Sequence, residues 1–272
     1  MKLSFIGTGN MGGAIARAVC TAVDPGSVYV SNRSLAKAEL LADDLGCRVC
    51  PTNPDCARGA DYIFLGVKPN MIRDVLREIA PVLQDWQVIV SMAAGVTGDA
   101  MRDALDGREN PIVRILPNTP CAIGRGLMLI APCGDVGPEI LSELTELLAP
   151  CGRIGYTDEA HADAGMVIGG CTPAYTYMFI EALADGAVRS GLTRQDALNW
   201  AAQAVSGAAE LLLQSGAHPG VLKDAVCSPA AAPSRASGHW RPRASAARSW
   251  TRYPPPAKRT RPSANKRRES GL

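Results

Sequence analysis

The sequence predicts an α/β fold: a doubly wound sheet over residues 1–157, followed by an all-helical domain over residues 158–229. Up to residue 157, short apolar runs rich in β-branched residues alternate with helical patterns. That alternation is typical of βαβ units in a mostly parallel sheet. Beyond it the apolar spacing is helical alone. A Gly-x-Gly-x-x-Gly stretch joins the first strand-like run to the first helical pattern. With 47% apolar residues, the chain has material for a sizeable core.

The glycine stretch lies between a strand predicted at 3–6 and a helix predicted at 11–22. At such a turn the first glycine allows the tight bend, the second lets the backbone approach a pyrophosphate, and the third lets the helix pack on the strand. Backbone N–H groups at the helix start attract negative charge. Similar glycine motifs occur in ordinary turns, but this position favours a Rossmann-type dinucleotide site formed by Gly7, Thr8, Gly9, Asn10, Met11 and Gly12.

The residues after the second predicted strand, 27–31, bear on which dinucleotide binds. NAD-binding folds usually place an acid there for the ribose 2′-hydroxyl, whereas an arginine with small polar neighbours suits a 2′-phosphate. Here Asn32, Arg33 and Ser34 follow the strand. We predict that all three contact the cofactor and that NADPH is favoured, with NADH possible. A second interpretation stays open, in which Ser34 caps the helix predicted at 35–45 and Arg33 is a solvated charge.

The run at 62–67 is apolar almost throughout, as in a strand buried on both faces. Residues at the carboxyl ends of parallel strands lie at the edge where ligands bind. We therefore predict cofactor contacts for Val67, Lys68 and Pro69 and for the small residues after the next strand, Ala93, Ala94 and Gly95. The other predicted elements of the sheet domain are strands at 48–50, 87–92, 111–116, 127–131 and 153–156, and helices near 55 and at 71–83 and 138–148.

Residues 158–229 predict helices at 160–168, 174–190 and 194–215, with another beginning near 222. The stretch 169–173, Gly-Gly-Cys-Thr-Pro, is predicted to interrupt the first two. The many Ala and Gly residues permit close packing of these helices. A set of only a few helices cannot bury its own apolar faces and needs a partner to do so. We therefore expect this domain to dimerise.

The composition argues against several kinds of site. Nine cysteines, an odd number and scattered, make no disulfide framework. Cys47-x-x-Cys50 with Cys56 nearby suggests zinc, but without a second pair or a nearby histidine we predict no metal site. We find no apolar run of the roughly 18 residues that a membrane span needs, and no signal-peptide pattern before the first strand. These observations predict a cytoplasmic protein that does not enter a membrane.

Eight motifs lie, in order, at 5–12, 32–34, 67–69, 93–95, 117–120, 173–175, 181–186 and 218–224. In these motifs, residues 1–229 resemble the pyrroline-5-carboxylate reductases. The resemblance implies NADPH-dependent reduction of 1-pyrroline-5-carboxylate to L-proline, the last step of proline biosynthesis, by a homodimer or larger oligomer. It also implies that Asn118 and Ser228 contact the substrate. A protonated imine is already electrophilic, so holding it against the nicotinamide with a donor near its nitrogen accounts for most of the catalysis.

The resemblance stops after Ser228-Pro229. The family continues with Gly-Gly, a small residue and Thr at a helix start, which implies backbone amides for the substrate carboxylate and a hydroxyl for the imine nitrogen. Here Ala230 to Arg235 follow instead, so the catalytic residue is unassigned and the helical domain is incomplete. Residues 230–272 are rich in Pro and Arg without helical periodicity, which predicts a disordered basic tail.

The codons of the tail suggest how the motif was lost. In the shifted frame, the last base of each codon is read with the first two bases of the next codon. Read in this way, the codons that encode Pro229 to Arg235 permit Gly-Gly-Ser-Thr-Ile-Ala, and the codons of His239 and Trp240 permit only Leu at their junction. We infer that residues from about 230 are a shifted reading of a reductase gene, through sequencing error or mutation. Resequencing across the Ser228 codon tests this inference, and an intact frame confirmed in protein would exclude a sequencing error.

Three alternatives stay open. The tail has 11 basic side chains and one acidic side chain, a formal charge of +10, which suits a nucleic-acid-binding arm. The family motif in the shifted reading frame would then be a coincidence, so we expect no nucleic-acid partner. A β-hydroxyacid-type dehydrogenase also begins with Gly-x-Gly-x-Met-Gly but relies on a helical-domain lysine, and Lys223 is the only lysine in residues 158–229. Finally, loss of the substrate motif permits an NADP-binding protein without turnover.

Overall fold

The computed structural model describes residues 1–227, so Ser228 and the predicted tail lie outside the described residues. The chain divides into one compact unit over Met1–Leu192 and a second that begins at Thr193. The predicted division at residue 157 coincides with the end of the sheet at Tyr156. It stays a prediction as a domain boundary.

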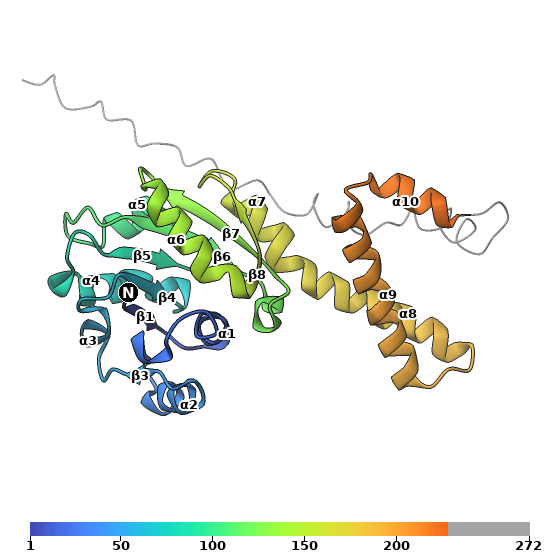
Figure 1. The fold of residues 1–272 in the computed structure, drawn as a ribbon, viewed down its shortest axis with the longest axis horizontal. Helices are drawn as coiled ribbons and strands as arrows, with labels where there is room; N and C mark the ends of the chain where they lie inside the picture. The colour runs from blue at the N-terminus through green and yellow to red at the C-terminus, as the bar shows by residue number, and fades with distance from the viewer. Residues whose placement is uncertain (228–272) are drawn as a thin grey trace, which may run out of the picture. The chain divides into compact units, whose positions relative to one another are not determined.

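Within the described residues, the first unit contains one sheet of eight strands in the order β3-β2-β1-β4-β5-β6-β7-β8 (Figure 1). Neighbouring strands are parallel except for β6 and β7, which are antiparallel. The chain therefore builds the sheet outward from β1 in one direction and then, from β4, in the other, as in a doubly wound fold. The strands are β1 (Leu3–Ile6), β2 (Val28–Ser31), β3 (Arg48–Val49), β4 (Tyr62–Leu65), β5 (Val88–Ser91), β6 (Ile112–Leu116), β7 (Gly126–Cys133) and β8 (Gly152–Tyr156).

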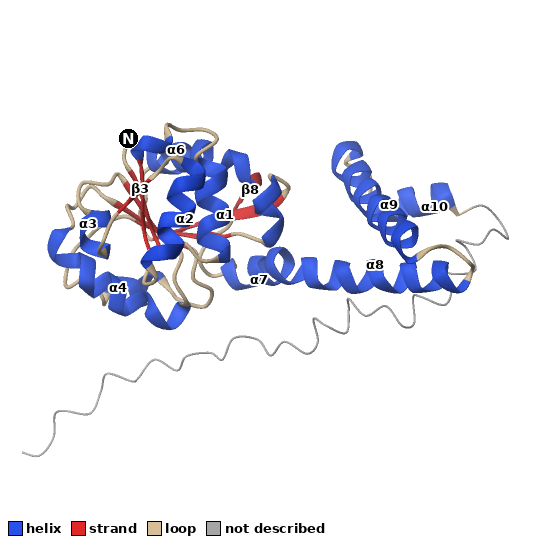
Figure 2. Ribbon diagram, turned by 90° about the horizontal axis from the view of Figure 1, so that it is seen from below, coloured by secondary structure: helices blue, strands red, loops and turns tan. Residues whose placement is uncertain are grey.

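Helices cover both faces of this sheet (Figure 2). One face packs against α1 (Asn10–Val19), α2 (Leu35–Leu45) and α6 (Pro138–Leu148). The other packs against α3 (Asn53–Ala57), α4 (Ile72–Ile79) and α5 (Gly98–Arg102). The sequence analysis did not predict α5, a single short helix capped by the Thr97 hydroxyl.

Strand β4 buries both of its faces, as the apolar run at 62–67 predicted. Successive side chains of a strand point to opposite faces. In β4, Phe64 packs with the α1 side of the core, where its ring stacks on Phe5 with centroids 4.5 Å apart. Its neighbours Ile63 and Leu65 pack on the α4 side, fully buried. A strand with two buried faces cannot alternate apolar with polar residues, which explains the continuous run.

Two helices near the end of the first unit follow one another without a loop. Helix α7 (Ala162–Met166) passes through a π-helical turn, Val167–Cys171, into α8 (Thr172–Arg189). The interruption predicted at 169–173 is therefore one widened turn. Pro173 lacks the N–H that an α-helix would donate to the Gly169 carbonyl four residues earlier. That carbonyl instead accepts a hydrogen bond from Asn118 Nδ2 at 3.1 Å.

The second unit contains α9 (Arg194–Ser215) and α10 (Pro219–Val226) among its described residues. Helix α9 begins and ends as predicted: the Thr193 hydroxyl accepts from the Asp196 N–H, and Gly216 closes the helix at φ 61°. With this helical segment after the mixed sheet, the predicted fold class is confirmed.

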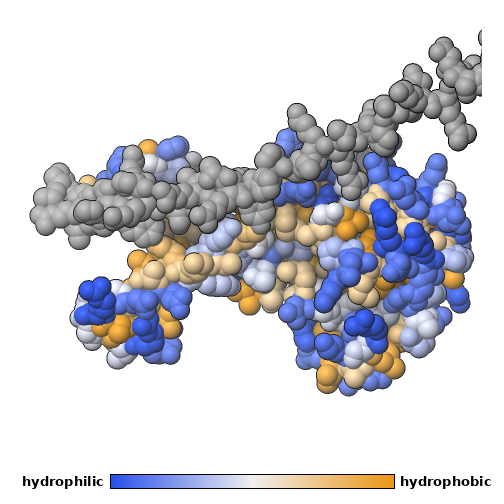
Figure 3. All heavy atoms as spheres, turned by 180° about the vertical axis from the view of Figure 1, so that it is seen from behind, coloured by the Kyte–Doolittle hydropathy of each residue, from blue (hydrophilic) through white to orange (hydrophobic). Residues whose placement is uncertain are grey.

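Large apolar side chains are exposed on several helices. Those on α8 include Tyr177 and Met178, and those on α9 include Trp200 and Leu213. Much of the surface of α8 is coloured as hydrophobic in Figure 3. Exposed apolar patches of this kind mark interaction surfaces. Among the helices of residues 1–227, none is long and apolar enough to cross a membrane.

Candidate functional site

The main cleft lies where the winding of the sheet reverses, at the carboxyl ends of β1 and β4. Ligands of open α/β sheets bind at this switch point. The cleft has a volume of about 820 Å³. Seven of the fifteen residues predicted to contact the cofactor line it, brought together from three separate strand ends: Gly7, Gly9, Asn32, Arg33, Ser34, Val67 and Lys68.

The glycine turn forms the floor of the cleft. Gly7 has a φ of 93°, a left-handed conformation that favours glycine, and a Cβ there would lie 2.7 Å from Val67 Cγ1. Its N–H donates to the Ser31 carbonyl at 2.9 Å, which ties the turn to the end of β2. A Cβ at Gly9, by contrast, would meet no atom within 4 Å. Gly7 therefore serves the fold, and Gly9 leaves the space that a bound group needs.

These different roles predict different effects for two alanine variants. Gly7→Ala is expected to destabilise the chain by more than about 2 kcal/mol, through strain and overpacking. Gly9→Ala is expected to change the free energy of unfolding by less than about 1 kcal/mol while weakening NADPH binding about tenfold or more. Thermal unfolding and NADPH fluorescence titration of both variants check this. Equal loss of stability in the two would contradict it.

The start of α1 offers partners for an anion. The first N–H groups of a helix have no partner within it, and they carry the positive end of the helix dipole. The first turn of α1 contains no acid that would compete for them. Beside it, the buried Thr8 hydroxyl has no hydrogen-bond partner in the described part of the chain.

Two basic side chains lie at the β2 side of the cleft. Arg33 and Lys37 are both exposed, and neither has an ion pair or hydrogen bond among residues 1–227. Lys37 was not among the predicted contacts. The available signal was its place in the first turn of the helix predicted at 35–45, shortly after Arg33 and Ser34. Residues 32–37 contain these two cations and no acid, which fits a 2′-phosphate better than a bare ribose hydroxyl.

Ser34 occupies the N-cap position of α2, as one interpretation held, but its hydroxyl makes no capping bond. Its carbonyl accepts from Asn32 Nδ2 at 3.1 Å, which fixes the turn between β2 and α2. The Ser34 hydroxyl, at the cleft, thus remains available to a ligand.

The other residues predicted to contact the cofactor do not line this cleft. Ala93, Ala94 and Gly95 follow β5, at the same carboxyl edge of the parallel strands, and Pro69 begins the turn before α4. Their contacts with a cofactor remain predictions, as do those of Thr8, Asn10, Met11 and Gly12.

Asn118, predicted to contact the substrate, has both ends of its side-chain amide engaged. Besides the bond from Nδ2 to Gly169, Oδ1 accepts from the Leu127 N–H at 3.0 Å. Asn118 thus ties β6, β7 and the π-helical turn together. Lys223 of α10 pairs with the neighbouring Asp224 carboxylate. Ser228 lies outside the described residues.

The three cysteines that suggested zinc do not all come together in the structure. Cys47 packs on the α1 side of the sheet, whereas Cys50 and Cys56 pack on the α4 side. A hydrogen bond with the Cys56 thiol lowers the pKa of Cys50 to about 7, against the effect of burial. Cys56 also accepts from the Ser4 hydroxyl at 3.1 Å. These thiols bond to core neighbours rather than converge on one ion.

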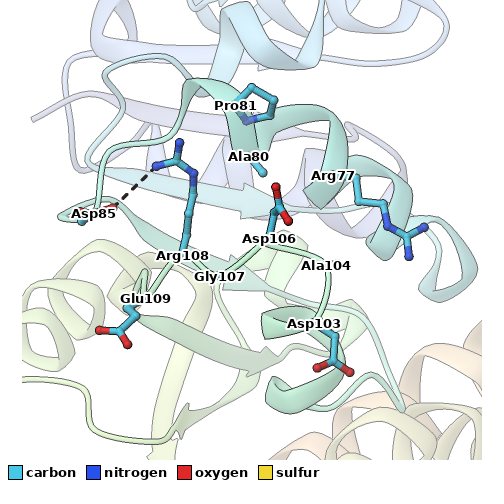
Figure 4. Close-up of a pocket in the computed structure, with 10 residues that line it drawn as sticks. All are labelled: Arg77, Ala80, Pro81, Asp85, Asp103, Ala104, Asp106, Gly107, Arg108 and Glu109. Atoms are coloured by element: carbon cyan, nitrogen blue, oxygen red, sulfur yellow. Dashed lines mark ion pairs between the residues drawn. The ribbon is translucent and has the colours of Figure 1, made fainter.

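A second hollow, of about 740 Å³, contains none of the predicted site residues. It lies near the amino ends of β5 and β6, opposite the ligand-binding edge, and Figure 4 shows its ion pair between Arg108 and Asp85. Asp106, at its rim, has a φ of 53° and is the one non-glycine residue with positive φ in the described chain.

This conformation predicts that Asp106→Gly stabilises the first unit by about 0.5 kcal/mol, because glycine adopts positive φ without strain. Asp103→Gly is the control, since Asp103 has a φ of −55°. There glycine is expected to destabilise by a similar amount, about 0.5–1 kcal/mol. Urea unfolding midpoints check the opposite signs, and a loss of stability in both variants would contradict the argument.

Comparison with known proteins adds family models and relatives. Residues 159–238 match the model described as "Pyrroline-5-carboxylate reductase dimerisation". Residues 2–95 match "NADP oxidoreductase coenzyme F420-dependent". The chain is 40% identical to a pyrroline-5-carboxylate reductase of Escherichia coli over 230 residues, 84% of this chain and 85% of that one. It is 38% identical to that of Glycine max, covering 84% and 83%.

Solved structures agree with these matches. The chain superposes on a pyrroline-5-carboxylate reductase from Coxiella burnetii with a TM-score of 0.82 at 28% identity, covering 92% of each chain. The Plasmodium falciparum enzyme, solved with NADP bound, gives 0.80 at 27% identity, with 92% of this chain and 93% of that one covered. Together with the sequence identity over most of the curated relatives, this shows that the chain belongs to the pyrroline-5-carboxylate reductase family.

Proposed function

We propose that this chain is an NADPH-dependent oxidoreductase that reduces 1-pyrroline-5-carboxylate to L-proline. The observation that carries the proposal is the cleft at the switch point, where the glycine turn and the basic side chains of Arg33 and Lys37 converge. Membership of the reductase family supports the choice of substrate.

The reaction adds a hydride to the carbon of the C=N bond and leaves the nitrogen with its proton. NADPH, when bound, supplies the hydride. The chain's contribution is mainly to bind and orient. Helix α1 and the glycine turn would hold the pyrophosphate, and Arg33, Ser34 and Lys37 would hold the 2′-phosphate. An iminium carbon needs little further activation, so positioning provides most of the rate enhancement.

The direct test measures NADPH oxidation and proline formation by the purified 272-residue chain supplied with pyrroline-5-carboxylate. Equal amounts of NADPH consumed and proline formed are expected, with NADH used more slowly. Oxidation of NADPH without proline would contradict the proposal, because it would indicate another acceptor.

A second candidate function is NADPH binding without turnover. The observation that favours it is the sequence after Pro229, where the substrate motif of the family is absent. Fluorescence titration with NADPH, run beside the assay, decides between the two candidates. Saturable NADPH binding with no detectable proline would support the second candidate. Absence of both NADPH binding and proline formation would contradict both candidates.

We further propose that the chain forms a homodimer through its helical segment. The dimerisation match over residues 159–238 and the exposed aromatic and aliphatic side chains of α8 and α9 support it. Light scattering during size-exclusion chromatography tests the oligomeric state, and a monomer at micromolar concentration would contradict the proposal. The cytoplasmic location stays a prediction, which cell fractionation tests.

A further inference from the structure

Three hydrogen-bonded side chains connect three elements that line the cofactor cleft. The Ser31 hydroxyl, at the end of β2, donates to Asn53 Oδ1 at 2.8 Å. Asn53 Nδ2, at the start of α3, donates to Glu78 Oε2 at 2.7 Å. Glu78 belongs to the last turn of α4, and all three residues line the cleft.

The carboxylate decides which way the Asn53 amide lies. A serine hydroxyl either donates or accepts, so Ser31 alone would bond to the amide in both of its orientations. An ionised carboxylate only accepts. Glu78 therefore requires an N–H on its side, which sends Oδ1 to Ser31 and leaves one amide N–H and one oxygen lone pair for a further partner.

Glu78 lies where an acid is electrostatically unfavourable. It lies near the C-terminal end of α4, where the helix dipole disfavours an acid. It also lines a cleft whose proposed occupant carries several negative phosphates. Asp74, one turn earlier on the same helix, lines the cleft too, but its one charged partner among the described residues is Arg77, at 3.7 Å.

We propose that Glu78 is a positioning residue for cofactor binding. By accepting from Asn53, it holds the free Asn53 N–H in place for the adenosine half of NADPH. The adenosine half is indicated because Arg33 and Lys37, the proposed 2′-phosphate ligands, line the same cleft. This inference rests on the proposed cofactor.

The test measures dissociation constants of purified variants for NADPH, for adenosine 2′,5′-bisphosphate and for reduced nicotinamide mononucleotide. Glu78→Ala is expected to weaken the first two about tenfold and leave the third unchanged, with thermal unfolding within about 2 °C of the unaltered chain. Glu78→Gln keeps an acceptor oxygen and is expected to bind within about threefold of the unaltered chain. Combining Glu78→Ala with Asn53→Ala is expected to weaken binding no further than Asn53→Ala alone.

Asp74→Ala is the matched control, because it removes the same charge from the same helix without touching Asn53. It is expected to leave the dissociation constants unchanged or lower them. Unchanged or tighter binding in Glu78→Ala would overturn the inference, as would a Gln variant as weak as the Ala variant, or equal weakening in Asp74→Ala. If the unaltered chain binds neither NADPH nor adenosine 2′,5′-bisphosphate, the proposed function fails instead.

Discussion

Arg33→Asp is expected to weaken NADPH binding by about 10- to 100-fold and to reverse the preference, so that NADH binds more tightly than NADPH. Arg33 lines the cleft, and among residues 1–227 it has no partner that would occupy its guanidinium. An acid at this strand end accepts from a ribose 2′-hydroxyl and repels a 2′-phosphate. Titrations with both nucleotides, followed by fluorescence, measure the change.

The control for this variant is Arg153→Asp. Arg153 is an exposed residue of β8, at the edge of the sheet opposite β3, and the substitution makes the same change in charge. It is expected to leave both dissociation constants unchanged. An unaltered preference in Arg33→Asp would remove Arg33 from the 2′-phosphate site and leave Lys37 as the ligand to test.

If the inferred frameshift is correct, inserting one base into the Pro229 codon produces the Gly-Gly-Ser-Thr reading that residues 229–233 permit. This change is expected to raise kcat/KM for pyrroline-5-carboxylate by about 100-fold or more. Removing one donor that stabilises the transition state typically costs about 10²–10³ in rate. The dissociation constant for NADPH is expected to stay the same, since the cleft residues all lie before residue 80. Steady-state kinetics and titration of both chains check this.

The matching control inserts three bases at the same codon, which adds a residue without changing the frame. It is expected to leave kcat/KM at the value of the 272-residue chain. If the protein from the gene with one inserted base were no more active than the 272-residue chain, residues 230–272 would not stand in place of a motif needed for activity. The account of the tail would then be wrong.

Local patterns predicted much of the fold. Helices α2, α6 and α9 begin and end at the predicted residues, and β4 is the strand buried on both faces that the apolar run at 62–67 predicted. The widened turn before α8 was harder to predict from the local sequence. Pro173 suggested an interruption, but the helix continues. The Gly169 carbonyl that Pro173 leaves without a donor accepts a hydrogen bond from Asn118, more than 50 residues earlier.

In the candidate site too, the sequence indicated the residues that belong to local motifs and not those that are connected by long-range contacts. The glycine turn, Arg33 and Lys68 follow strands and carry motifs, so the sequence indicated them directly. Asn53 and Glu78 carry no motif, and what connects them is a hydrogen bond across 25 positions of the chain. Such pairings depend on how α3 and α4 pack on the sheet, and local sequence does not encode that packing.

Transfer of deuterium from NADPH to proline tests the central claim most directly. The 272-residue chain, incubated for a long period with pyrroline-5-carboxylate and NADPH deuterated at the transferred position, is expected to form proline one mass unit heavier. The label is expected on the ring carbon that was double-bonded to nitrogen. Unlabelled proline, or no proline from a chain that binds NADPH, would contradict the claim that this chain reduces the cyclic imine.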